Sequence, residues 1–170
     1  MRALIISSQL ILAASLVPAA AEAPPPPAIT VVRPYVRATP EGATTAAAYL
    51  ELQAQPGISD AFVGVATPAA HRAEIHSHTM VGGVMQMRRV DSLDLAPGGK
   101  LMLAPHGNHI MLLNLKAPLK AGGHVHLTLT FKQSPPVEID VPVIALGAAA
   151  PQASSEQPAQ SYRTGASTQF

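Results

Sequence analysis

The stretch AEIHSHTMVGGVMQMRRV, residues 73–90, indicates the fold of this chain more clearly than any other. It consists of two short runs on either side of Gly82-Gly83, and neither run carries a helical apolar stripe. A two-glycine loop suits a primed β-turn, because its central residues need a positive φ that glycine adopts without steric cost. The stretch is therefore predicted to form a β-hairpin.

This hairpin would bring imidazole and thioether side chains together. A two-residue loop places Met80 opposite Met85 and His78 opposite Met87. Alternate residues of a strand share a face, so His76 is expected on the same face, diagonal to Met87. One face of the hairpin would thus carry two histidines and three methionines.

The rest of the chain continues the pattern of short strands. Alternating or β-branched runs recur between clusters rich in Gly and Pro, and no internal repeat is present. Such spacing is typical of an antiparallel β-sandwich or barrel. The predicted strands are residues 29–37, 44–53, 61–67, 73–80, 83–91, 100–104, 109–115, 124–132 and 137–146.

The N-terminus has the layout of a secretory signal peptide, with Arg2 before an apolar run and small residues up to Ala23. That run is interrupted at residues 7–9 and is shorter than the roughly 20 apolar residues of a membrane span. We therefore expect a periplasmic mature chain without a membrane span. The expected organisation is a signal peptide at 1–21, a Pro-rich linker at 22–28, one folded domain at 29–146 and a disordered tail at 147–170.

Charge and composition argue against several functions. The chain has 11 Lys and Arg against 10 Asp and Glu, with no basic cluster, which disfavours nucleic acid as a partner. It has no cysteine, which excludes a thiol nucleophile, a thiolate zinc site and a blue-copper site. No G-x-S-x-G elbow and no recognisable pair of carboxylates is visible, so we expect no catalytic residues and no enzyme activity.

Histidines and methionines are concentrated in one part of the chain. Every methionine except the initiator lies within residues 80–111, and five of the seven histidines lie within residues 71–109. His109 and Met111 are two residues apart and so share a face of one predicted strand. Thioethers are neutral and soft, so a mixed Met/His site favours Cu(I) over Zn, Mg or Ca. Neutral ligands also suit an ion that must be handed on, as in a carrier.

These residues resemble the spacing signature of the periplasmic copper chaperones of the PCu(A)C family. Ten residues separate His76 from Met87, and twenty-one more separate Met87 from His109-Ile-Met111. The resemblance extends to VRATPEGATTAAAYLEL at 36–52 and covers residues 29–143.

The resemblance implies a cupredoxin-like antiparallel Greek-key β-sandwich that lacks a cupredoxin's cysteine. It implies a Cu(I) site near the surface made by His76, Met87, His109 and Met111, with Cu(II) as a second candidate ion. It further implies copper delivery to the CuA centre of cytochrome c oxidase subunit II, alongside a Sco-type thiol protein. Two alternatives stay open: an exported immunoglobulin-like interaction module, and a periplasmic copper-resistance or storage protein.

The other histidines and methionines receive weaker functional interpretations. Met80 and Met85 are interpreted mainly as packing or supporting residues, and Met102 as a core residue. His78 is the rival ligand, because the hairpin register puts it opposite Met87. The remaining histidines are expected at solvated positions: His71, His106, His124 and His126. Two features depart from the family pattern: the tail contains no His or Met, and Tyr35 stands where relatives often have Trp.

Overall fold

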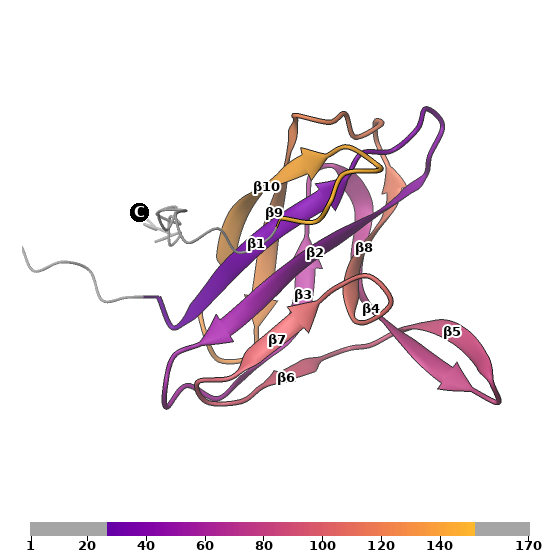
Figure 1. Ribbon diagram of the computed structural model, residues 1–170. Helices are drawn as coiled ribbons and strands as arrows, with labels where there is room; N and C mark the ends of the chain where they lie inside the picture. The colour runs from indigo at the N-terminus through magenta and orange to yellow at the C-terminus, as the bar shows by residue number, and fades with distance from the viewer. Residues whose placement is uncertain (1–26, 152–170) are drawn as a thin grey trace, which may run out of the picture.

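The computed structural model describes residues 27–151, which form strands and turns and include no helix (Figure 1). No helix that could cross a membrane is therefore found within this range. The expected signal peptide, most of the linker and residues 152–170 of the expected tail lie outside the described residues. The strands are β1 (Ile29–Arg37), β2 (Thr45–Ala54), β3 (Asp60–Ala66), β4 (Ala70–Val81), β5 (Val84–Arg89), β6 (Leu93–Leu95), β7 (Lys100–Leu103), β8 (His109–Leu115), β9 (His124–Phe131) and β10 (Val137–Ile144).

The strands follow the order β5-β4-β8-β2-β1-β10-β9-β3-β6, with β7 also paired to β2. All neighbours are antiparallel except β1 and β10, which run parallel through Val36 opposite Val143 and Arg37 opposite Ile144. The all-β, cupredoxin-like prediction is confirmed, but the sheet is mixed rather than wholly antiparallel. Parallel strands need a long connection, and here almost the whole domain lies between the first strand and the last.

One hydrophobic core lies between the half containing β1, β2, β4 and β8 and the half containing β3, β9 and β10. Alternating residues of these strands point inward, as the period of two requires. Ile110 and Leu112 of β8, for example, are fully buried. The largest buried side chains come from both halves and include Leu52, Phe62, Leu112, Leu127, Leu129 and Ile139.

Strand β2 sets the position of the β7–β8 connection. Its C-terminal part pairs with β7, and its N-terminal part pairs with β8 along the same edge. Between them the chain makes a short loop, closed by a hydrogen bond of 2.7 Å from the Ala104 N–H to the Asn108 carbonyl. This loop places His106 in a turn and ends where His109 begins β8.

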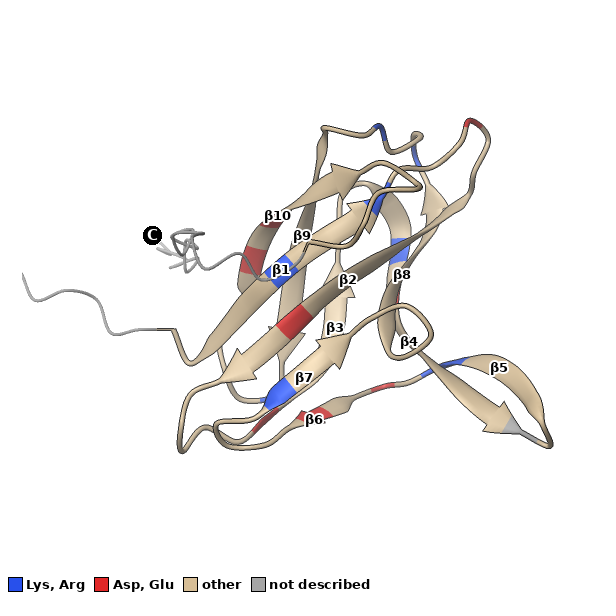
Figure 2. Cartoon of the chain, viewed as in Figure 1, with Lys and Arg blue, Asp and Glu red and all other residues tan. Residues whose placement is uncertain are grey.

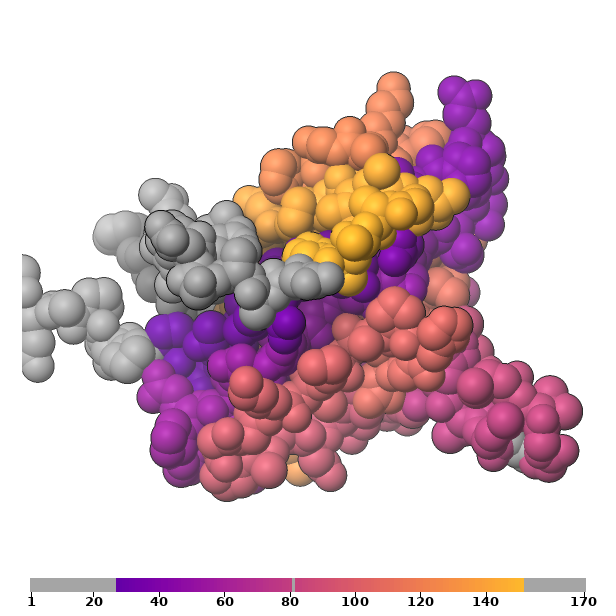
Figure 3. All heavy atoms as spheres, viewed as in Figure 1, coloured from indigo at the N-terminus to yellow at the C-terminus, as the bar shows by residue number. Residues whose placement is uncertain are grey.

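The predicted hairpin of β4 and β5 is present, with Gly82 at φ 59° and Gly83 at φ 81°. It projects from the body of the molecule as a separate arm (Figures 1 and 3). The structure adds β6, a three-residue strand pairing with β3 that the sequence did not predict. Three residues are too few to show a period, which explains why it was missed.

Charged side chains are scattered over the strands in the view of Figure 2, where an acidic position on β2 faces a basic one on β7. These are Glu51 and Lys100, with 3.4 Å between the carboxylate and the ammonium nitrogen. Glu51 is buried and also accepts hydrogen bonds from Arg33 and Gln53. Burial acts to raise the pKa of Glu51, but these donors together lower it, so the carboxylate stays ionised and joins β1, β2 and β7.

Candidate copper site

Strand β4 lies between β5 and β8 and brings the expected ligands together. On the β8 side, His76 lies opposite His109, and Glu74 lies opposite Met111. On the β5 side, His78 lies opposite Met87. Because alternate residues share a face, all of these positions project from the same face of the sheet. The hairpin register expected from the sequence is therefore confirmed.

The two imidazoles of the expected set are close neighbours. The ring centroids of His76 and His109 lie 6.0 Å apart. His109 is only 3% exposed, because the 104–108 loop and the neighbouring strands surround it. A site at this point would be open on the β5 side and closed on the β8 side.

A backbone hydrogen bond orients His109. Its Nδ1–H donates to the Gly107 carbonyl oxygen at 3.0 Å. A carbonyl can only accept, so Nδ1 carries the hydrogen and Nε2 keeps a free lone pair. Burial lowers the pKa of His109, which holds the ring in the neutral form that metals bind. Metal-ligating histidines are commonly oriented by a hydrogen bond of this kind.

A carboxylate orients His76 in the same way. Its Nε2 lies 3.0 Å from the Oε2 of Glu74, and the hydrogen bond from His76 lowers the pKa of Glu74 so that the carboxylate accepts. The hydrogen of His76 is thus on Nε2, which leaves a lone pair on Nδ1. That Nδ1 is buried and has no hydrogen-bond partner among the described residues. A buried nitrogen without a partner is costly, so the Nδ1 of His76 is a candidate metal ligand.

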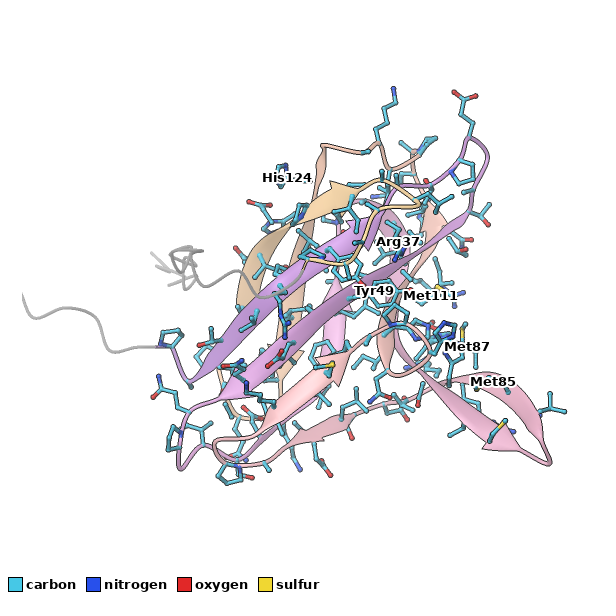
Figure 4. The ribbon with its side chains drawn as sticks, in the orientation of Figure 1. Arg37, Tyr49, Met85, Met87, Met111 and His124 are labelled. Atoms are coloured by element: carbon cyan, nitrogen blue, oxygen red, sulfur yellow. The ribbon has the colours of Figure 1, made fainter. Side chains whose placement is uncertain are left out.

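Two thioethers accompany the imidazoles. Met111 is partly buried on β8, and Met87 on β5 is 45% exposed. Figure 4 shows both near the junction of β4, β5 and β8, with Met85 farther out along the hairpin. The structure therefore gathers His76, Met87, His109 and Met111 on one face, as the spacing predicted.

Two further histidines belong to the same neighbourhood. The His78 ring lies 5.0 Å from that of His109, and its buried Nδ1 also lacks a hydrogen-bond partner among the described residues. The exposed His106 ring stacks against that of His78, with 6.4 Å between the ring centroids. Within residues 27–151, no three His, Asp or Glu side chains converge on one point as a metal site.

The prediction that Met102 is a core residue was wrong, and of the two roles expected for Met80 and Met85, packing or support, the structure excludes packing in the core. Met80 and Met85 are 67% and 54% exposed, so they do not pack into a core. Met102 is 58% exposed, because β7 alternates and its neighbour Leu103 is the side chain that enters the core. It lies opposite Glu51 of β2.

The remaining histidines occupy solvated positions as expected. His71 and His124 are exposed. His126 is half-buried, and its Nδ1 lies 3.1 Å from the Asp140 carboxylate. No further imidazole or carboxylate of the described residues completes a metal site around His124 and His126.

Sequence reasoning missed two residues that support the site. Glu74 was given no role from the sequence, although its position two residues before His76 on one strand was a usable signal. Tyr49 of β2 has its ring 6.3 Å from that of His109 and 5.1 Å from that of Tyr35. These aromatic rings extend the row of side chains across the sheet, as Figure 4 shows for Tyr49 beside the site.

A family model described as "Putative lipoprotein LpqE-like" matches residues 29–143. A curated relative, "Putative lipoprotein Lxx21020" of Leifsonia xyli subsp. xyli, is 34% identical over 116 residues, which are 68% of this chain and 69% of that protein. The match to the family model spans nearly the whole domain described above.

PCuAC domains and a Cu(I)-bound protein are among the solved structures that are similar to this chain. The copper-bound PCuAC domain from PmoF2 has 26% identity and a TM-score of 0.59, with 69% of this chain and 93% of that chain covered. The solution structure of CuI-DR1885 from Deinococcus radiodurans has 32% identity and a TM-score of 0.55, with 74% and 83% covered. The apo form of DR1885 has 28% identity and a TM-score of 0.56, with 85% and 97% covered. With a family model matched over most of its length and PCuAC domains as structural neighbours, the chain belongs to the LpqE-like family of PCuAC-type domains.

Proposed function

We propose that this protein is an exported Cu(I) carrier that holds the ion through His76, Met87, His109 and Met111. The observation that supports it best is the pair of oriented imidazoles, in which His76 leaves Nδ1 unpaired and His109 leaves Nε2 free. The structural neighbours, which include a copper-bound and a Cu(I)-bound form, support the choice of ion. The name of the curated relative, a lipoprotein, supports export.

The donor set selects the oxidation state. Two neutral imidazole nitrogens and two thioether sulfurs suit Cu(I), because soft sulfur ligands favour the reduced ion. Neither thioether has to lose a proton before it binds, and neither can be lost to a disulfide. Such a site works in an oxidising compartment where a thiolate site would be at risk.

The geometry favours a carrier over a store. The site is buried on its β8 side and reached through the exposed Met87 on its β5 side. A docked recipient could replace Met87 first and the buried His109 last, so the ion would never be released free. Transfer to a site with thiolate and imidazole ligands would be downhill, because thiolates hold copper more tightly than thioethers.

We further propose that the recipient is the CuA centre of cytochrome c oxidase subunit II, with a Sco-type thiol protein as a co-operating partner. The test mixes the Cu(I)-loaded protein with the isolated apo domain of subunit II, separates the two and measures copper in each. We expect copper to be found in subunit II, and none to be found in a variant of subunit II that lacks the CuA cysteines. Copper that stays on the donor would refute CuA as the recipient.

The carrier assignment is tested by titrating the protein with Cu(I) against a chromophoric Cu(I) chelator. The parent is expected to bind one equivalent of Cu(I) tightly, and the variant His76→Ala/Met111→Leu is expected to lose this binding. Met102→Leu is the matched control, because Met102 is an exposed methionine outside the site. A folded parent without a tight equivalent would refute the carrier function and favour an interaction module.

A further inference from the structure

The outer part of the β4–β5 hairpin carries a second set of metal-binding side chains beyond the four ligands of the proposed site. Met80 lies directly opposite Met85, and the next pair inward on that face is His78 opposite Met87. Side chains at these alternate positions project from one face of the hairpin. Three thioethers and one imidazole therefore form a row that leads from the turn to the proposed site.

The outer pair of this row is more exposed than the inner pair. Met80 and Met85 are 67% and 54% exposed, whereas Met87 is 45% exposed and His78 is half-buried. Methionine side chains are normally buried, and a pair of them this exposed contributes nothing to the core. Figure 3 shows the hairpin as an arm standing away from the body of the molecule.

The chemistry of the arm suits a soft cation. No Asp, Glu, Lys or Arg occurs within residues 77–87, so the outer part of the hairpin neither repels a cation nor holds it by charge. Arg88 and Arg89 lie at the inner end of β5. His78 has a buried Nδ1 without a hydrogen-bond partner among the described residues, which makes its imidazole an available ligand. Two thioethers and one imidazole are a soft, neutral set that selects Cu(I).

We propose that Met80, Met85 and His78 form an outer Cu(I) site through which the ion enters and leaves the inner site. This inference rests on the proposed function. The Met80–Met85 pair and the His78–Met87 pair lie about 7 Å apart along the strands, a distance that these long side chains can span. In the step, the Cu–S bond to Met85 is replaced by a Cu–S bond to Met87, and copper stays Cu(I). Because all these ligands are neutral, no proton and no electron is transferred.

The test is the variant Met80→Leu/Met85→Leu. Leucine keeps the apolar area of the arm and removes only the sulfur atoms, so the variant separates thioether chemistry from apolar contact with a partner. Two quantities are measured: the number of Cu(I) equivalents bound, using a tight and a weak chromophoric chelator, and the stopped-flow rate of copper transfer to excess chelator. Met102→Leu is again the control.

The parent is expected to bind one tight and one weaker equivalent. The double variant should lose the weaker equivalent, keep the tight one and transfer copper about tenfold more slowly, as removal of a metal ligand would do. An unchanged weaker equivalent and an unchanged rate would overturn the outer site. A tight equivalent absent from the parent would instead refute the proposed function, so the two failures are distinguishable.

Discussion

At the scale of single residues, a hydrogen bond on one ring nitrogen of His76 and of His109 determines which nitrogen is left to bind a metal. The Nε2–H of His76 donates a hydrogen bond to the Glu74 carboxylate, and the Nδ1–H of His109 donates one to the Gly107 carbonyl oxygen. Each bond selects the tautomer and so the nitrogen left available to a metal. Spacing in the sequence suggested the four proposed ligands, but it did not give the tautomers, because a tautomer depends on contacts made in three dimensions.

The Glu74 contact gives a prediction. Glu74→Gln should weaken Cu(I) binding by about 10- to 100-fold, because a neutral amide orients the imidazole less firmly than a carboxylate. Competition titration with a Cu(I) chelator measures this. Asp140→Asn is the matched control, since it removes an equivalent carboxylate from His126 outside the site. Equal affinities for the Glu74 variant and the parent would contradict the orienting role.

At the scale of elements, the turn of the β4–β5 hairpin sets the register of the site. Gly82 and Gly83 both have positive φ, and a side chain at either position would meet open space. Gly83→Ala should therefore cost about 1 kcal/mol in backbone strain alone and shift the register enough to weaken Cu(I) binding. Gly122→Ala is matched to it, with φ +85° and open space in another turn. Both variants should lower the free energy of unfolding in urea, but only Gly83→Ala should change Cu(I) affinity.

Another element-scale contact joins β3 to the connection after β9. The Asp60 carboxylate accepts hydrogen bonds from the N–H groups of Ala61, Gln133 and Ser134 at 2.7, 2.9 and 2.8 Å. Burial acts to raise the pKa of Asp60, but these hydrogen bonds, with a contribution from the Ser134 side chain, lower it from 3.8 to about 2. The ionised carboxylate is therefore favoured in the folded state.

Asp60→Asn should destabilise the protein by about 1–3 kcal/mol at neutral pH, because one amide nitrogen replaces an acceptor oxygen. Since the folded pKa lies below the unfolded one, the stability from Asp60 is present above about pH 4 and is lost as the pH falls towards 2. The difference in free energy of unfolding between the parent and Asp60→Asn, measured with urea, should narrow over that pH range. Asp94→Asn, at an exposed position, should have the same free energy of unfolding as the parent. A difference between the parent and Asp60→Asn that does not depend on pH would contradict the lowered pKa of Asp60.

At the scale of the whole molecule, one core connects both halves of the sheet, so the site depends on strands far from it. Leu127 of β9 is fully buried in the half that carries none of the proposed ligands. Leu127→Ala should cost about 2–5 kcal/mol, and thermal unfolding should remain a single transition. Leu146→Ala, at an exposed leucine, should have little effect. Two separate transitions would show that the halves unfold independently.

The sequence by itself determined most of the strands, the hairpin and its register, and the spacing of the four expected ligands. These features depend on turn chemistry and on a period of two, which operate within a few residues. It failed where a side chain's environment depends on distant strands: Met102 was expected in the core but is exposed on β7. Only the tertiary structure decided that β8 lies beside β4, which puts His109 opposite His76, and that β1 and β10 meet in parallel. Pairing between strands far apart in the chain is selected by the burial of one shared core, and no local pattern encodes it.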